Sequence, residues 1–135
     1  MKDTKEEIFG VTFLLIRPNG EILMQLRDQH APKYPNMLCI PGGTTDSGES
    51  VSACLLREVD EEYAIKLRKT DCKEVLRYKL SYGRTAVVYI CKIGMEVAPK
   101  LQEGRAMKWM LLSEIQKHTL AFEQNQILVA MERHV

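Results

Sequence analysis

The stretch that decides the fold runs from Gly43 to Ile65 and reads GTTDSGESVSACLLREVDEEYAI. Its first part, up to Glu49, is rich in Gly, Thr, Ser and Asp, residues that favour a loop. From Ser50 to Tyr63 there is neither Gly nor Pro, and this composition favours a helix. The sequence therefore predicts a flexible loop that leads directly into a helix.

Three acidic residues continue the apolar stripe of this predicted helix. At steps of three and four, the stripe and its acidic extension comprise Val51, Cys54, Leu55, Glu58, Glu61 and Glu62. Carboxylates that share one turn and face the protein interior repel one another and lose hydration, so a compensating cation is expected. Carboxylate oxygens favour Mg²⁺ or Mn²⁺ over zinc, and Mg²⁺ sites commonly include substrate phosphate oxygens. The alternative is a solvated acidic face, which Asp60 would extend.

The glycines before the helix favour the metal-site interpretation. Gly42, Gly43 and Gly48 allow tight turns and a close approach of backbone carbonyl and amide groups to a bound ion or phosphate. Loop and helix together predict one unit that holds a divalent metal, and oxygen ligands of this type indicate phosphate chemistry.

The order of residues in this stretch resembles the signature box of the Nudix hydrolases. Five residues separate Gly43 from Glu49, seven more lead to Arg57, and Glu58-Val59-Asp60-Glu61-Glu62 follows at once. Only the glycine expected at position 64 is absent, because Ala64 stands there. In this family that glycine serves as a left-handed helix cap, so the replacement has a modest conformational cost.

The resemblance carries specific expectations about fold and site. It implies an α/β fold, a Nudix-type α/β/α sandwich with a central mixed β-sheet, and metal-dependent hydrolysis of a diphosphate linkage in a nucleotide-like substrate. It also implies that the Gly43 carbonyl and the Glu58, Glu61 and Glu62 carboxylates bind metal, Mg²⁺ or in its place Mn²⁺. Glu49 and Arg57 are expected to pair and to brace the loop against the helix.

The remaining sequence predicts the elements around this unit. The 135 residues are expected to form one domain, 1–135. A turn at Pro18-Asn19-Gly20 joins two predicted strands, and Ser113 is a plausible N-cap for a short helix. The predicted strands are 8–16, 21–27, 38–40, 75–82, 85–93 and 107–112, and a last helix at 122–133 packs through Ile127, Leu128 and Met131.

Composition favours a small ligand and a cytoplasmic protein. With 19 Lys and Arg against 18 Asp and Glu, the net charge of +1 creates no field to gather a nucleic-acid strand. The N-terminus lacks the apolar run of a signal peptide or membrane span. Cys39, Cys54, Cys72 and Cys91 form no C-x-x-C pair and are expected to be reduced core residues. Both a monomer and a homodimer are compatible with the sequence.

Further residues resemble those of MutT-type nucleoside triphosphate pyrophosphatases. Glu103, in QEGRAMKW, resembles a loop acid that acts as general base or extra ligand, so Glu103 and Glu58 are both candidates for the base. Asn125 resembles a base-recognising amide. The alternatives are an ordinary solvated loop acid and a helix-capping or surface Asn. Trp109 is expected in the core, although it could stack on a base.

Basic residues beside the box are candidates for contacts with substrate phosphates. Arg27, Lys33 and Arg84 have this potential, and simple solvation is the alternative for each. Tyr82 favours a second substrate class, the dinucleoside polyphosphates. Ala64 is the one feature that favours a third interpretation, a nucleotide-binding sensor with weak catalysis.

Overall fold

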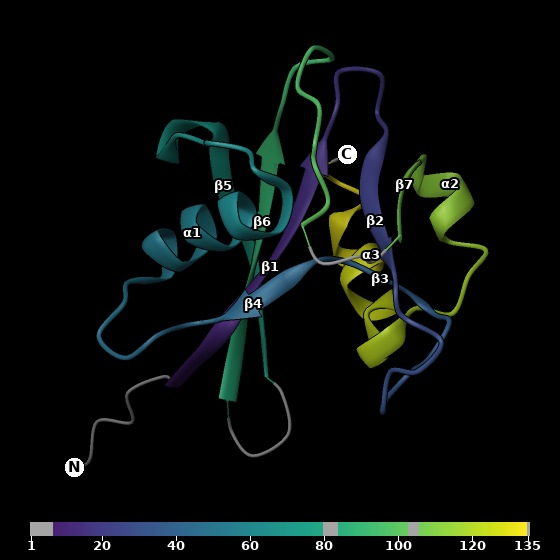
Figure 1. Ribbon diagram of the computed structural model, residues 1–135, viewed down its shortest axis with the longest axis horizontal. Coiled ribbons are helices and arrows are strands. Elements are labelled where there is room, and N and C mark those ends of the chain that lie inside the picture. The colour runs from purple at the N-terminus through teal and green to yellow at the C-terminus, as the bar shows by residue number, and fades with distance from the viewer. Residues whose placement is uncertain (1–6, 80–83, 103–105, 135) are drawn as a thin grey trace.

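A mixed seven-stranded sheet runs through the middle of the computed structural model, which describes residues 7–79, 84–102 and 106–134 (Figure 1). The main path has the order β3-β2-β1-β6-β5, with β4 paired to β1 and β7 paired to β2. The central pair β1 and β6 is parallel, whereas the other pairs are antiparallel. The strands are β1 (Glu7–Ile16), β2 (Ile22–Leu26), β3 (Leu38–Cys39), β4 (Gly42–Thr44), β5 (Cys72–Lys79), β6 (Arg84–Lys92) and β7 (Ala106–Met110).

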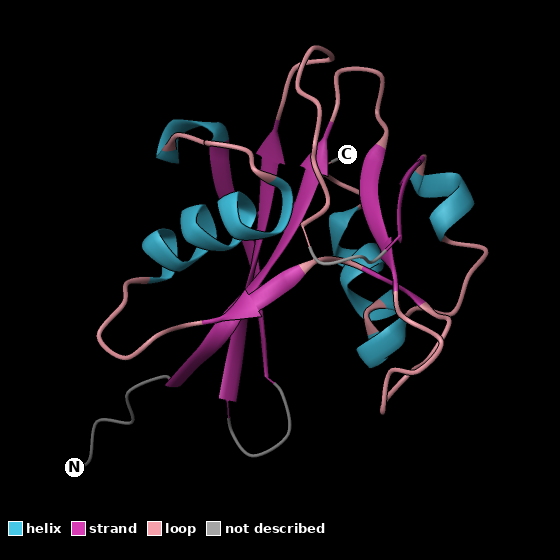
Figure 2. Cartoon of the chain, in the orientation of Figure 1, coloured by secondary structure: helices cyan, strands magenta, loops and turns pink. Residues whose placement is uncertain are grey.

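Helices cover both faces of the sheet (Figures 1 and 2). One face carries α1 (Val51–Tyr63), and the opposite face carries the short helix η3 (Ala121–Glu123) with α3 (Asn125–Met131). The remaining helical segments are η1 (Lys69–Asp71), which leads into β5, and α2 (Leu112–Ile115), which follows β7. This arrangement confirms the predicted α/β/α sandwich with a central mixed sheet.

Alternation along β1 divides the core into two layers. Phe13 and Leu15 pack with Leu55 and Val59 beneath α1, whereas Leu14 packs toward α3 on the opposite face. Successive side chains of a strand point to opposite faces, so a continuous apolar run is expected when both faces are covered. Strand β1 therefore supports both helical layers at once.

Local signals set both ends of α1. The Ser50 hydroxyl accepts a hydrogen bond of 3.1 Å from the Ala53 amide, a standard N-cap. At the other end Ala64 adopts a left-handed conformation, with φ of 55°, and its amide donates to the Asp60 carbonyl at 2.8 Å. The predicted left-handed cap is thus present with alanine in place of glycine, at a conformational cost of about 1 kcal/mol.

The beginning of the predicted loop differs from expectation. Gly42 and Gly43 lie in β4, which pairs antiparallel with β1 so that Gly43 is opposite Val11. The glycine content favoured a loop, but here it permits close contact, because a methyl group at Gly10 would overlap the Gly43 carbonyl. The loop is therefore limited to the residues between Thr44 and α1.

Two predictions near the C-terminal end were also inaccurate. Strand β7 ends at Met110, and Leu111, not Ser113, is the N-cap of α2, because the Glu114 carboxylate accepts a hydrogen bond of 3.1 Å from the Leu111 amide. The last helix is split because Phe122 and Glu123 have left-handed backbones, with φ of 56° and 55°. Across the described residues, none of the helices has the length and apolar character that a bilayer span requires.

Candidate active site

An arginine joins the loop to α1. Arg57 donates two hydrogen bonds to Glu49, from Nε to Oε2 at 2.7 Å and from Nη2 to Oε1 at 2.9 Å. Nη2 also donates to the Thr44 carbonyl at 3.0 Å, and Glu49 Oε1 accepts from the Asp46 amide at 3.0 Å. Through the Arg57 hydrogen bond, the pKa of Glu49 falls to about 2. The pair expected between these residues is therefore formed, and it ties β4 and the loop to the helix.

The three box acids lie in different environments. Glu58 and Glu62 are buried, with 8% and 9% of their surface exposed, whereas the Glu61 side chain is 58% exposed. The expectation that all three face inward was wrong for Glu61, which lies at the rim of the stripe. Arg57 Nη1 donates to Glu58 at 2.9 Å and to Glu61 at 3.1 Å. Burial nevertheless raises the pKa of Glu58.

The Glu58 carboxyl group lies directly on the backbone of β4. A methyl group added to Gly43 would overlap all three atoms of that carboxyl group. Glycine is therefore required at position 43 for steric reasons, although its backbone is an ordinary strand conformation. This contact brings a buried carboxylate beside the main chain of the strand that precedes the loop.

The chemistry of these donors fits a hard divalent cation. Two buried carboxylates on neighbouring turns need a nearby positive charge, and Arg57 supplies part of it to Glu58. Among the residues that the structure describes, no three Asp, Glu, His or Cys side chains already converge as a cation site. The metal roles of Gly43, Glu58, Glu61 and Glu62 therefore stay predictions.

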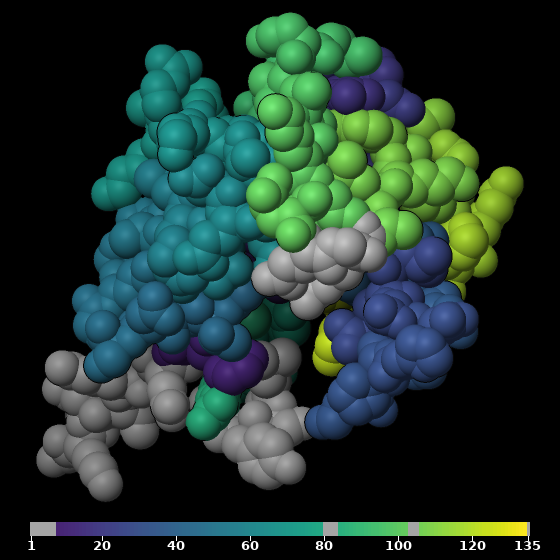
Figure 3. All heavy atoms as spheres, viewed as in Figure 1, coloured from purple at the N-terminus to yellow at the C-terminus, as the bar shows by residue number. Residues whose placement is uncertain are grey.

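The segment before position 103 is attached to the end of α1. The Lys100 amide donates to the Tyr63 carbonyl at 2.8 Å, and the Gln102 amide donates to the Glu62 carbonyl at 3.1 Å. Figure 3 shows this segment against the helix. Glu103 and Tyr82 lie outside the described residues. Residues 100–102, which immediately precede the predicted loop acid, are therefore bonded to the last turn of α1.

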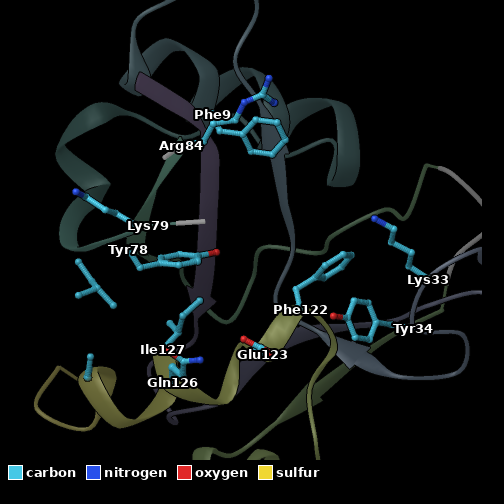
Figure 4. A pocket seen from close by; sticks show the side chains of 12 residues that line it. Phe9, Lys33, Tyr34, Tyr78, Lys79, Arg84, Phe122, Glu123, Gln126 and Ile127 are labelled. Carbon is cyan, nitrogen blue, oxygen red and sulfur yellow. The ribbon is translucent and has the colours of Figure 1, made fainter. Parts of the chain in front are cut away.

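A cavity of about 710 Å³ opens on the other side of β1, between the sheet and α3 (Figure 4). Lys33 and Arg84, both predicted phosphate contacts, line it together with Lys79. Arg27 is close to this cavity, because its guanidinium lies 4.8 Å from the ring centre of Phe122 and its Nε donates to the Lys33 carbonyl at 3.0 Å. The structure therefore gathers basic side chains around one opening.

The comparisons with known proteins agree with this geometry. The model of the NUDIX domain matches residues 8–131. The chain belongs to the NUDIX domain family. Nudix hydrolase 5 of Arabidopsis thaliana is 29% identical over 113 residues, which are 78% of this chain and 36% of that protein. The NUDIX chain thus spans about a third of the length of this curated relative.

Solved structures share the fold of this NUDIX domain. A MutT structure, from work on Aliivibrio salmonicida and Vibrio cholerae, has a TM-score of 0.80, 16% identity, and coverage of 96% of this chain and 100% of that chain. The MutT protein of Methanosarcina mazei has a TM-score of 0.72, 22% identity and coverage of 98% and 97%. The NUDIX domain of Shewanella oneidensis NrtR, in complex with ADP ribose, has a TM-score of 0.73, 20% identity and coverage of 96% and 89%.

Two aromatic residues that line this cavity were not predicted from the sequence. The rings of Tyr34 and Phe122 are 4.8 Å apart, edge to face, with 37% and 43% of each residue exposed. Both have a left-handed backbone, with φ of 53° and 56°. No periodic pattern marks such positions, because the left-handed conformation is unusual for aromatic residues. They come from segments nearly ninety residues apart and meet only in the fold.

Two other predicted positions have local structural contacts. Asn125 accepts a hydrogen bond of 2.7 Å from the Leu120 amide and donates one of 2.8 Å to the His118 carbonyl. Both ends of its amide therefore hold the loop before η3, and its base contact stays a prediction. Trp109 is half-buried against the core beneath α1, with the Arg17 guanidinium 3.7 Å from its ring centre, in agreement with the core interpretation.

The cavity and the box are linked through one end of β1. Phe9 lines the cavity, and its carbonyl accepts a hydrogen bond of 3.1 Å from the Thr45 amide in the box loop. Gly10, the next residue, pairs with Thr44. The end of β1 that lines the cavity is therefore hydrogen-bonded to the beginning of the box loop.

Proposed function

We propose that this NUDIX domain hydrolyses a diphosphate linkage in a nucleoside triphosphate or a related nucleotide, with Mg²⁺ as cofactor, and releases pyrophosphate. The observation that carries this proposal is the buried Glu58 carboxylate on the Gly43 backbone, held by Arg57. Glu58 is buried one helical turn from Glu61 and Glu62. Cation binding would explain why a carboxylate is buried beside two further acids.

The metal would be held by the Gly43 carbonyl and the carboxylates of Glu58, Glu61 and Glu62, with Mn²⁺ as a substitute. When bound, such an ion offsets phosphate charge and lowers the pKa of the attacking water. Arg57 keeps the helix and loop in register through its bidentate contact with Glu49. That brace fixes the distance between the strand carbonyl and the helical carboxylates.

Glu58 and Glu103 are the candidates for the general base. Burial raises the pKa of Glu58, which makes its carboxylate a better proton acceptor than an exposed one. The hydrogen bond from Arg57 Nη1 orients that carboxylate. Glu103 would act from the loop that follows the contact between Gln102 and Glu62. In either case water is the nucleophile, so the chain forms no covalent bond with the substrate.

The cavity provides surfaces that suit a nucleotide. The Tyr34 and Phe122 rings offer a stacking surface for a base, and Gln126 and Glu123 nearby offer polar groups to its edge. Lys33, Arg84 and Arg27 would contact the phosphates. Because Asn125 is engaged with its own loop, Gln126 is the better placed amide for the base.

A substrate panel tests this proposal. The protein is incubated with Mg²⁺ and nucleoside triphosphates, dinucleoside polyphosphates or nucleoside diphosphate sugars, and the products are separated by ion chromatography. We expect monophosphate and pyrophosphate from a triphosphate, abolished by EDTA. Preference for a dinucleoside polyphosphate would move the substrate to the alternative class. Binding without release from any member would favour a nucleotide sensor and contradict the proposed hydrolysis. We also propose that the protein is cytoplasmic and is a monomer or a homodimer.

A further inference from the structure

Two cysteines, neither of them a predicted site residue, are opposite each other in the β5–β6 pair. Cys72 begins β5 and Cys91 lies near the end of β6, and the two are direct partners in the antiparallel register. Side chains of directly opposed residues lie on the same face of a sheet, with Cβ atoms about 4.5–5.5 Å apart. The Cα spacing of either kind of antiparallel pair, about 4.5 or 5.5 Å, falls within the range that a disulfide spans.

The two thiols differ in burial and in acidity. Cys91 is fully buried in the core beneath α1, whereas Cys72 is half-buried on β5, the last strand of the main sheet path. The neighbouring Cys91 thiol lowers the pKa of Cys72, whereas the Cys72 thiol and burial raise that of Cys91. Cys72 is thus the more accessible and more acidic thiol, whereas the buried Cys91 favours its protonated form.

The other cysteines lack this arrangement. Cys39 is opposite Gln25 in the β2–β3 pair, and Cys54 lies on α1 beside Arg57. Burial raises the pKa of Cys54 to about 12, which disfavours its thiolate. The pairing of Cys72 with Cys91 is therefore specific and does not follow from cysteine content alone.

We propose that Cys72 and Cys91 form a reversible cross-strand disulfide when the protein meets a peroxide. The Cys72 thiolate attacks one peroxide oxygen, the O–O bond breaks, and the products are a Cys72 sulfenic acid and water. The Cys91 sulfur then attacks the Cys72 sulfur, and the sulfenic hydroxyl leaves as water with the Cys91 proton. Two thiols are oxidised by two electrons in total, and the peroxide is reduced to two molecules of water.

The bond would attach the chain that leaves α1 to the strand beneath that helix. Residues 64–71 connect α1 to Cys72, and Cys91 packs with Leu15 and Val59 in the core under the helix. Closing a ring from position 72 to 91 restricts separation of β5 from β6. The disulfide would therefore hold β5 and β6 together under oxidising conditions, without a chemical change at Glu58 or Glu61.

Peptide mapping of the complete chain tests this proposal. The reduced protein is treated with hydrogen peroxide at near-stoichiometric amounts, free thiols are alkylated, and the intact mass and tryptic peptides are measured. We expect a loss of two hydrogen atoms, protection of two of the four thiols, and a linked peptide pair containing Cys72 and Cys91. Dithiothreitol should restore all four alkylation sites.

Serine variants supply matched controls. Cys72→Ser and Cys91→Ser should each abolish the intramolecular bond, whereas Cys39→Ser and Cys54→Ser should keep it. A buried serine at position 91 can impair folding. Peptide mapping of the peroxide-treated wild type therefore decides the outcome without relying on this variant. Linked peptides that join other cysteines, bonds only between separate chains, or a Cys72 oxidised while Cys91 stays free would each overturn the proposal.

Discussion

The carboxyl group of Glu58 occupies the space that a side chain at Gly43 would need. This contact connects the start of the box, on β4, with its end, on α1. The Glu49–Arg57 pair joins the loop to α1, and Arg57 also donates to the Thr44 carbonyl of β4. Strand, loop and helix are thus joined at two points, and two of the predicted metal ligands, Gly43 and Glu58, form one of them.

Gly43→Ala should displace Glu58, because the added methyl group would overlap its carboxyl group. We expect Mg²⁺-dependent hydrolysis to fall at least tenfold, as expected when metal ligands are misplaced by about 1 Å. Initial rates at saturating Mg²⁺ measure this effect. Gly48→Ala is the matched control, because Gly48 has positive φ but open space around its Cβ position. Gly48→Ala should lose stability but keep most of its activity. Equal losses of activity in Gly43→Ala and Gly48→Ala would contradict the steric explanation.

The brace should make stability depend on pH. The pKa of Glu49 falls from its ordinary value of 4.5 to about 2 through its hydrogen bond with Arg57. A carboxyl with a lowered folded-state pKa stabilises the protein above the unfolded value and loses that contribution as pH falls through the folded value. Between about pH 4.5 and 2, the wild type should therefore lose more stability than Glu49→Gln in urea denaturation. Parallel losses in both proteins would contradict the brace.

Gln124 should stabilise the junction between β3, β4 and η3. Its buried side chain accepts a hydrogen bond of 2.7 Å from the Ile40 amide and donates one of 3.2 Å to the Ile40 carbonyl. Gln124→Ala would leave both buried backbone groups without these partners and should lower the free energy of unfolding by about 2 kcal/mol or more. The exposed Gln126→Ala should change it by less than about 0.5 kcal/mol. Similar values for the two variants in chemical denaturation would be inconsistent with this role.

The exposed ring of Phe122 should contribute to nucleotide binding. Base stacking on an aromatic ring contributes about 1–3 kcal/mol, so Phe122→Ala should raise KM by roughly tenfold while kcat changes little. Val129→Ala is the control, because Val129 is also exposed on α3 but does not line the cavity. Steady-state kinetics with the best substrate of the panel gives both parameters. An unchanged KM for Phe122→Ala would place the base elsewhere.

The sequence predicted the box and its framework because both depend on local patterns. The spacing from Gly43 to Glu62 fixes which residues meet on a loop and one helix, and the apolar runs of β1 and β6 mark central strands. The cavity was not predictable in the same way. Its aromatic pair, Tyr34 and Phe122, depends on left-handed backbones and on contact between distant segments. Likewise the glycine-rich start of the box favoured a loop, and only pairing with β1 made it β4.

Binding of Mn²⁺, followed by electron paramagnetic resonance, tests the central claim most directly. The wild-type chain is titrated with Mn²⁺ beside Glu58→Gln, and the exposed acid variant Glu74→Gln on β5 serves as the control. Glu58→Gln keeps the shape of the side chain but removes its negative charge. We predict saturable binding by the wild type and by Glu74→Gln, weakened at least tenfold in Glu58→Gln, with hydrolysis lost in parallel. Equal Mn²⁺ affinity in all three proteins would contradict a metal site built on Glu58.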